Sequence, residues 1–357
     1  RHLHNQSVLL VLDNFEHLLD APESEPLSPA LAALTDLLGA ASGVAVLATS
    51  REPLALHGEW TVPLDGLPYT STNGEPLAHP APQLFIQAAR RYRPSFDPPV
   101  YTEAILEICR QTDGMPLALE MAAAWMRAYD CPEIARRIAQ SLDFLTSPFR
   151  DAPSRQRSIR AIFTSAWEQL TPAQQSNLAA MSVFLGGFTV QAALTIAQAS
   201  VLDLAALVEK TFLRHTGNGR YDLLYLVRQF AAENLAASEQ SEAVRARHAD
   251  FYLTVLAEQG QGLYGAAPHE ALQTLRQEVD NVRQTWAWLM CGEDFSRAVR
   301  VAVPLEDFYR MAGLIGEAEV IFREAVQWAE RKAAPGRDLA ALLIQLATVL
   351  SYEGQAE

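Results

Sequence analysis

Two strand-length apolar runs lie near the beginning of the chain, and each leads directly into polar residues. Ser7–Leu12 ends at Asp13, and Gly43–Thr49 is followed within two residues by Arg51. Continuous apolar runs of this length are typical of parallel strands buried on both faces. A helix is predicted between them over Pro29–Leu38, because its leucines fall on one face. Strand, helix and strand in this order predict a parallel sheet with a crossover helix.

The rest of the first half is predicted to be mainly helical. Trp60–Leu64 is expected to form a short third strand near a sheet edge or a strand end, since Pro63 lacks an N–H. Pro68–Pro82 is rich in Pro, Ser, Thr, Asn and Gly and is expected to form a linker or surface loop. Helices are predicted after it over residues 83–93, 101–111, 116–129 and 132–145.

The second half begins with a polar break at residues 148–158. Helices are predicted over 158–169, 189–199 and 202–210, and another from Thr171, where Thr is a good N-cap and Pro172 suits the first helical position. Residues 212–224 have the pattern of a hairpin, so this region is interpreted as a winged helix. Residues 225–357 are expected to be helical. Their Gly-x-Ala pattern at Gly316 and again at Gly354 is compatible with stacked helix pairs, although two copies do not establish a repeat.

Composition excludes several classes of function. The formal net charge of −14 argues against direct nucleic-acid binding, which needs clustered Lys and Arg. The apolar runs are too short to cross a bilayer, and no basic-then-apolar leader opens the chain. Cys109, Cys131 and Cys291 are widely spaced and odd in number, which favours buried free thiols in a reducing cytoplasm.

The residues that follow the two predicted strands are the candidates for binding a ligand. Parallel strands present their carboxyl ends at one edge of the sheet, where nucleotides and Mg²⁺ bind in many α/β proteins. Asp13 has the position of a Walker B acid, and Arg51 places a guanidinium that can bind a phosphate with two hydrogen bonds. Each residue also has a purely structural interpretation, because apolar strands often end in Asp and a loop Arg is often solvated.

Four motifs, in the right order over residues 7–235, resemble the bacterial NB-ARC-type members of the STAND ATPases (signal-transduction ATPases with numerous domains). The first two are Leu9–Leu18, reading Leu-Leu-Val-Leu-Asp-Asn-Phe-Glu-His-Leu, and Leu47–Leu54, reading Leu-Ala-Thr-Ser-Arg-Glu-Pro-Leu. The third is Asp113–Leu119, which matches the Gly-x-Pro motif, and the fourth is Tyr221–Ala231, which resembles the winged-helix signature. The segment Glu278–Arg283 also resembles the opening of the repeat region in these proteins.

The resemblance implies a role for particular residues. Asp13 matches the Walker B aspartate that holds Mg²⁺ through water, and Arg51 matches the sensor arginine near the γ-phosphate of ATP. Gly114 and Pro116 match the Gly-x-Pro motif, whose proline packs against adenine at the start of a helix. A structural proline is the alternative, since its fixed φ suits a first helical turn in any protein.

Three departures qualify this resemblance. Asn14 stands where many relatives have a second acid, so hydrolysis is expected to be slow unless Glu16, a weak candidate, replaces that acid. Leu223, Leu224 and Tyr225 replace the Met-His-Asp triplet of plant and animal relatives. No Gly-x-x-x-x-Gly-Lys-Ser/Thr loop occurs, which predicts either a fragment whose P-loop lies upstream or a degenerate ATPase that binds no nucleotide.

The predicted fold is therefore α/β, as part of a P-loop NTPase with a parallel sheet, followed by mainly α structure. The predicted domains are 1–67, the C-terminal half of the NTPase; 68–150, a helical domain; 151–238, a winged helix; and 239–357, the start of tetratricopeptide-like repeats. The hypothesis is a cytoplasmic switch gated by ATP or ADP with Mg²⁺, which regulates an output such as transcription.

The predicted partners follow from this hypothesis. An inducer or partner protein would bind the repeats, with self-association possible on activation, no membrane contact, and DNA binding only through a domain outside this chain. The fragment alone is expected to be inactive as an ATPase. The alternative is an interaction scaffold with no nucleotide dependence.

Overall fold

The computed structural model describes residues 3, 6–19, 27–70, 75–147 and 157–353. These residues form two compact units. The first unit contains Arg1–Ile162 together with Leu202–Arg214, and the second contains Phe163–Val201 together with His215–Glu357.

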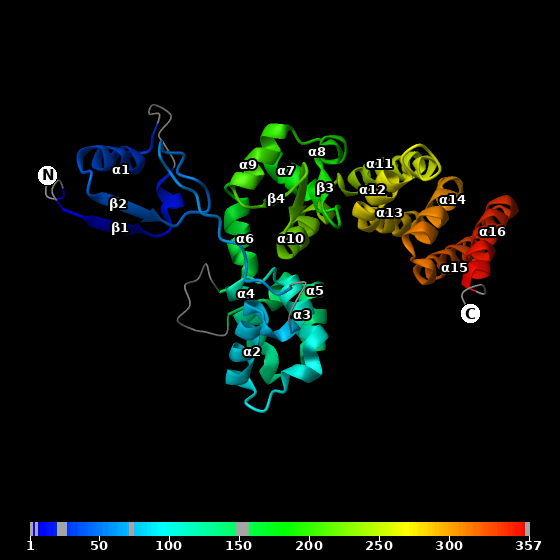
Figure 1. Ribbon diagram of the computed structural model, residues 1–357, viewed down its shortest axis with the longest axis horizontal. Coiled ribbons are helices and arrows are strands. Elements are labelled where there is room, and N and C mark those ends of the chain that lie inside the picture. Colours follow the sequence, from blue (N-terminus) through cyan, green and yellow to red (C-terminus); the bar gives the residue numbers. More distant parts are fainter. Residues whose placement is uncertain (1–2, 4–5, 20–26, 71–74, 148–156, 354–357) are drawn as a thin grey trace. The chain divides into compact units, whose positions relative to one another are not determined.

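The first unit opens with the predicted parallel strand pair. Strands β1 (Val8–Leu12) and β2 (Val44–Ala48) run parallel in a register that places Val8 beside Val44 and Leu12 beside Ala48. Helix α1 (Pro29–Ala40) provides the crossover between them (Figure 1). The Ser28 hydroxyl accepts the Leu31 N–H at 3.2 Å. Ser28 is therefore the N-cap of this helix, and Pro29 is its first residue.

The two faces of this small sheet differ. Phe15, Leu31 and Leu34 form a core beside the half-buried residues of one face. On the other face Leu9, Val11 and Leu47 are 61%, 63% and 56% exposed. One apolar face of the sheet is therefore open to solvent.

The expected third strand at Trp60–Leu64 is wrong. This segment has no strand structure, and Trp60 and Leu64 are 93% and 90% exposed. Pro63 removes one ladder donor, and among the described residues no strand lies alongside to pair with the others. The segment therefore continues as irregular chain into residue 70.

The middle of the first unit is a helical bundle that begins earlier than predicted. The expected linker to Pro82 ends sooner, because a short 3₁₀ helix occupies Pro76–Ala78 and α2 starts at Pro80. Helix α2 packs on α4, and α3 packs on α5. The four helices are α2 (Pro80–Tyr92), α3 (Thr102–Gln111), α4 (Pro116–Ala124) and α5 (Cys131–Gln140). Further 3₁₀ turns occupy Pro98–Tyr101, Trp125–Arg127 and Leu142–Phe144.

The next elements alternate helices with short strands. Thr171 and Gln174 form a reciprocal capping box at the start of α7, where the sequence predicts a helix start. Strands β3, β4 and β5 form one sheet in the order β3-β5-β4, and β3 was not predicted. The elements are α6 (Ile159–Trp167), α7 (Pro172–Met181), β3 (Phe188–Thr189), α8 (Val190–Ala192) with a π-helical turn at Ala193–Ala197, α9 (Val201–Glu209), β4 (Leu213–Gly217), β5 (Arg220–Leu223) and α10 (Tyr225–Ala236).

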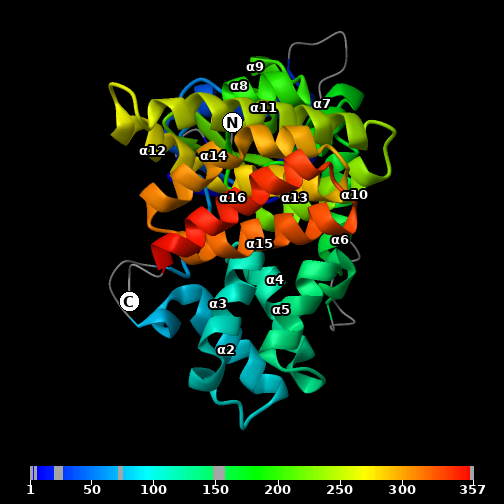
Figure 2. The same ribbon diagram turned by 90° about the vertical axis from the view of Figure 1, so that its right-hand side faces the viewer.

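The rest of the second unit is a run of packed helices, as predicted (Figure 2). They are α11 (Ser241–Gly262), α12 (Pro268–Gln277), α13 (Val279–Cys291), α14 (Phe295–Ala312), α15 (Ile315–Arg331) and α16 (Gly336–Glu353). Their aromatic side chains build the core, including Trp286, Phe308, Tyr309, Phe322 and Trp328. Gly316 lies in the first turn of α15, whereas Gly354 is outside the described residues. Within the described residues, no single helix is both long enough and apolar enough to cross a membrane.

Candidate functional site

The carboxyl ends of β1 and β2 lie side by side. The Thr49 N–H donates to the Leu12 carbonyl at 2.8 Å, and the Phe15 N–H donates to the Thr49 carbonyl at 2.9 Å. Backbone pairing thus continues past the last strand residues, Leu12 and Ala48. Residues 13 and 49 are consequently held at the same edge of the sheet, as the sequence predicts for a parallel pair.

Asp13 is fixed at this edge by its neighbour. The Thr49 hydroxyl donates to Asp13 Oδ1 at 2.5 Å and accepts the Asn14 N–H at 3.0 Å. Asn14 has φ 55° and ψ 48°, a left-handed conformation that Asn tolerates better than most residues. The Asp13 side chain is therefore oriented by Thr49 while the residue stays exposed to solvent.

Arg51 lies on the same edge and pairs with Glu16. Arg51 Nε is 3.5 Å from Glu16 Oε1, and the two side chains are 40% and 7% exposed. The other carboxylate oxygen, Glu16 Oε2, is buried and accepts no hydrogen bond within the described structure. Sequence analysis gave Glu16 as a weak candidate for the catalytic acid. In the structure, Glu16 instead lies beside Arg51, the predicted phosphate-binding arginine.

The Gly-x-Pro motif forms the turn between α3 and α4. Asp113 and Gly114 both have positive φ, at 49° and 65°, and the Gly114 N–H donates to the Cys109 carbonyl at 3.0 Å. This left-handed pair ends α3, and α4 then begins at Pro116. Pro116 itself is exposed, whereas Gly114 is buried.

The motif turn is in direct backbone contact with an earlier segment of the chain. The Leu67 N–H donates to the Gly114 carbonyl at 2.9 Å. A Cβ atom on Gly66 would lie 1.9 Å from the Asp113 carbonyl oxygen, and one on Gly114 would lie 2.0 Å from the Leu67 carbonyl oxygen. Only glycine fits at these two crossing points, so we call residues 66–67 and 113–114 the glycine clasp.

Asp113 also forms an ion pair at this turn. Its carboxylate is 3.4 Å from Arg214 Nη2, and its side chain is only 8% exposed. Burial raises the pKa of Tyr69, and the negative charge of Asp113 raises it further. Asp113 thus connects the motif turn with the end of the Leu202–Arg214 segment of the first unit.

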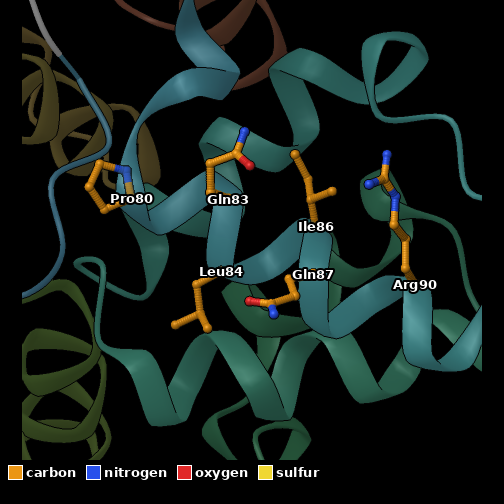
Figure 3. Close-up of a pocket in the computed structure, with 6 residues that line it drawn as sticks. All are labelled: Pro80, Gln83, Leu84, Ile86, Gln87 and Arg90. Carbon is orange, nitrogen blue, oxygen red and sulfur yellow. The ribbon is translucent and has the colours of Figure 1, made fainter.

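The structure brings together some of the predicted site residues. Asp13 and Arg51 share one sheet edge, while Gly114 and Pro116 share one turn. Among the described residues, no hydrogen bond or ion pair joins the two groups. A surface pocket is lined by residues of α2 and by none of these four (Figure 3). A common nucleotide cleft therefore stays a prediction.

Two other kinds of site are metal-ligand clusters and reactive thiols. No cluster of His, Cys, Asp and Glu there could hold a metal ion directly. Cys109 and Cys131 are buried as predicted, and burial raises the pKa of each thiol to about 12, which keeps both protonated and unreactive. Cys291 is exposed, contrary to the prediction that all three thiols are buried.

The fold and the strand-edge site together define a mostly helical protein with a small parallel α/β part. Over 342 residues the chain is 33% identical to a protein of Mycobacterium tuberculosis named "Putative HTH-type transcriptional regulator Rv0890c". The match covers 92% of this chain and 36% of the relative, so the chain spans about a third of that protein's length. An uncharacterized protein of the same species is 32% identical over 260 residues, which cover 69% of this chain and 62% of that protein.

No protein-family profile matches the chain. A Signal Transduction ATPase with Numerous Domains from Pyrococcus horikoshii, with a tetratricopeptide repeat sensor, is 13% identical. That match has a TM-score of 0.28 and covers 99% of this chain and 51% of the other.

Proposed function

We propose that this chain is the switch and sensor part of a transcriptional regulator, gated by ATP and ADP. The observation that carries the proposal is the placement of Asp13 and Arg51 at one edge of a parallel strand pair. The relationship to a protein named as a transcriptional regulator supports transcription as the output.

The side chains at this edge fit a nucleotide with bound Mg²⁺. Asp13 is an exposed carboxylate, the ligand type that holds hydrated Mg²⁺, and Arg51 is a partly exposed guanidinium suited to a terminal phosphate. Pro116 is exposed at the first position of α4, where its ring is available for packing against a base. ATP differs from ADP by the γ-phosphate, so Arg51 is the residue that distinguishes the two.

The open face of the sheet supports a larger nucleotide-binding domain in the whole protein. Parallel sheets are covered on both faces, yet Leu9, Val11 and Leu47 are exposed here. We infer that further segments of the whole protein cover this face and supply the phosphate-binding loop.

The same hypothesis assigns roles to the remaining segments. We propose that α6–α10 with the β3-β5-β4 sheet form a winged helix that packs within the protein, and that α11–α16 bind an inducer or partner protein. Hydrolysis is expected to be slow because Asn14 cannot accept a proton from water.

The test measures ATP affinity of the whole protein by calorimetry with Mg²⁺. Asp13→Ala is expected to weaken binding of Mg²⁺–ATP at least tenfold, about 1.4 kcal/mol. Asp36→Ala is the matched control, because Asp36 is an exposed acid on α1 of the same unit. Binding that is undetectable in the wild type and in both variants would support the nucleotide-independent scaffold instead.

A further inference from the structure

Glu16 is placed by the first residues after β1. The left-handed Asn14 turns the chain, and a 3₁₀ helix follows over Phe15–Leu18. Phe15 is buried against Leu31 and Leu34, which anchors this turn in the core. Glu16 therefore comes directly after a core residue, with its side chain held at the edge that carries Arg51.

The environment of Glu16 is unusual for a carboxylate. Its side chain is 7% exposed, and Oε2 is buried without a hydrogen-bond donor in the described structure. A buried carboxylate needs a compensating charge, and Arg51 Nε, at 3.5 Å from Oε1, supplies it. This ion pair therefore limits the orientation of the Arg51 guanidinium and also balances the charge of Glu16.

The pair uses one edge of the guanidinium and leaves the other available. Arg51 meets Glu16 through Nε. Within the described residues, the Arg51 guanidinium donates no hydrogen bond and pairs with no acid other than Glu16, so its Nη1 and Nη2 groups have no further protein partner. These two groups are the ones that bind a phosphate through parallel hydrogen bonds.

We propose that Glu16 is a positioning residue, which holds Arg51 by Nε so that its Nη edge points to the γ-phosphate of bound ATP. The inference rests on the proposed function and assigns Glu16 a role other than the general base. A base must be free to take a proton from water, whereas this carboxylate is buried beside a guanidinium.

The test is the ratio of ATP to ADP affinity of the whole protein, since a merely structural role leaves that ratio unchanged. Glu16→Ala is expected to lower the ratio roughly tenfold. Glu16→Gln keeps a side chain of the same length with an oxygen beside Arg51 Nε, so it is expected to restore most of the ratio. A general base would give the reverse result, with hydrolysis lost in Glu16→Gln and the ratio intact.

Two further variants keep the result interpretable. In an Arg51→Ala background, Glu16→Ala is expected to change the ratio no further, because the two residues act through one contact. Glu52→Ala, which removes the next acid along the chain from Arg51, is the matched control and is expected to leave the ratio unchanged. Glu16→Met preserves the buried volume and replaces Glu16→Ala if the alanine variant does not fold.

The outcomes separate this inference from the proposed function. Nucleotide binding in the wild type with an unchanged ratio in Glu16→Ala and Glu16→Met overturns the role of Glu16 alone. A wild type that binds neither nucleotide overturns both.

Discussion

Arg220 on β5 and Glu278, directly before α13, form an ion pair that is largely shielded from solvent. Their side chains are 14% and 7% exposed, and Arg220 Nη1 donates to Glu278 Oε1. The pair joins the short sheet to the helices that follow within the second unit. The structure thus gives Glu278, which lies in a segment singled out by the sequence, a physical role within the second unit.

Breaking this pair from one side is expected to be destabilising. Arg220→Met leaves Glu278 buried without its partner, which costs about 3 kcal/mol of unfolding free energy. The double variant Arg220→Met/Glu278→Leu is expected to lose less than the sum of the two single variants, as chemical denaturation can measure. Arg323→Met is the control, because Arg323 and Glu319 pair at an exposed site and contribute about 1 kcal/mol or less. Additive losses would mean that the pair does not act as a unit.

The Asn281 side chain hydrogen-bonds to the backbone on both sides of Gly186. Its Oδ1 accepts the Leu185 N–H at 2.9 Å, and its Nδ2 donates to the Gly187 carbonyl at 3.0 Å. Asn281→Ala leaves the buried Gly187 carbonyl and the part-buried Leu185 N–H without these partners and is expected to cost about 2–4 kcal/mol in denaturant unfolding. Asn234→Ala, which loses one bond to its own helix, is expected to cost about 1 kcal/mol or less. Similar losses in the two variants would argue against a structural role for the Asn281 contacts.

His248 is buried beside Asn281 and Thr285, and burial lowers its pKa to about 4. The unfolded chain binds this proton near pH 6.5 and the folded chain only near pH 4, so stability falls as the pH drops through this window. The loss is expected to reach roughly 3 kcal/mol by pH 4. His248→Gln is expected to remove that part of the pH dependence, whereas His269→Gln, at an exposed position on α12, is expected to retain it. Parallel stability curves for wild type and His248→Gln between pH 4 and 7 would exclude this account.

The elements that sequence analysis predicted well are those set by local pattern. The two apolar runs gave β1 and β2 within one residue at each end, because an apolar run of strand length is visible in the sequence itself. The burial on both faces that these runs predicted is wrong within the described residues, since Leu9, Val11 and Leu47 are exposed. The start of α7 was also predicted from the sequence, since the Thr171-Pro172 pair is a local signal. The sharing of one sheet edge by Asp13 and Arg51 then follows from the geometry of parallel strands.

The features that were missed depend on contacts between distant segments. Asn281 and Leu185 are 96 residues apart, and nothing in either segment indicates that they meet. The burial of Glu16 was not predicted, because it depends on how the 3₁₀ turn packs. Trp60–Leu64 has a strand-like composition, yet without a neighbouring strand its backbone has no partner.

The glycine clasp offers a prediction that separates tertiary contact from intrinsic helix propensity. In Gly66→Ala the new Cβ meets the Asp113 carbonyl oxygen at 1.9 Å, and backbone cannot move aside as a flexible side chain can. The variant is expected to lose about 1–3 kcal/mol of unfolding free energy. Gly39→Ala is the matched control, since no atom lies within 4 Å of its Cβ position on α1, and it is expected to gain about 0.5–1 kcal/mol from helix propensity. Opposite signs in thermal unfolding would confirm that residues 66–67 are held against the Gly-x-Pro turn, whereas a neutral Gly66→Ala would show that residues 66–67 do not hold this contact in solution.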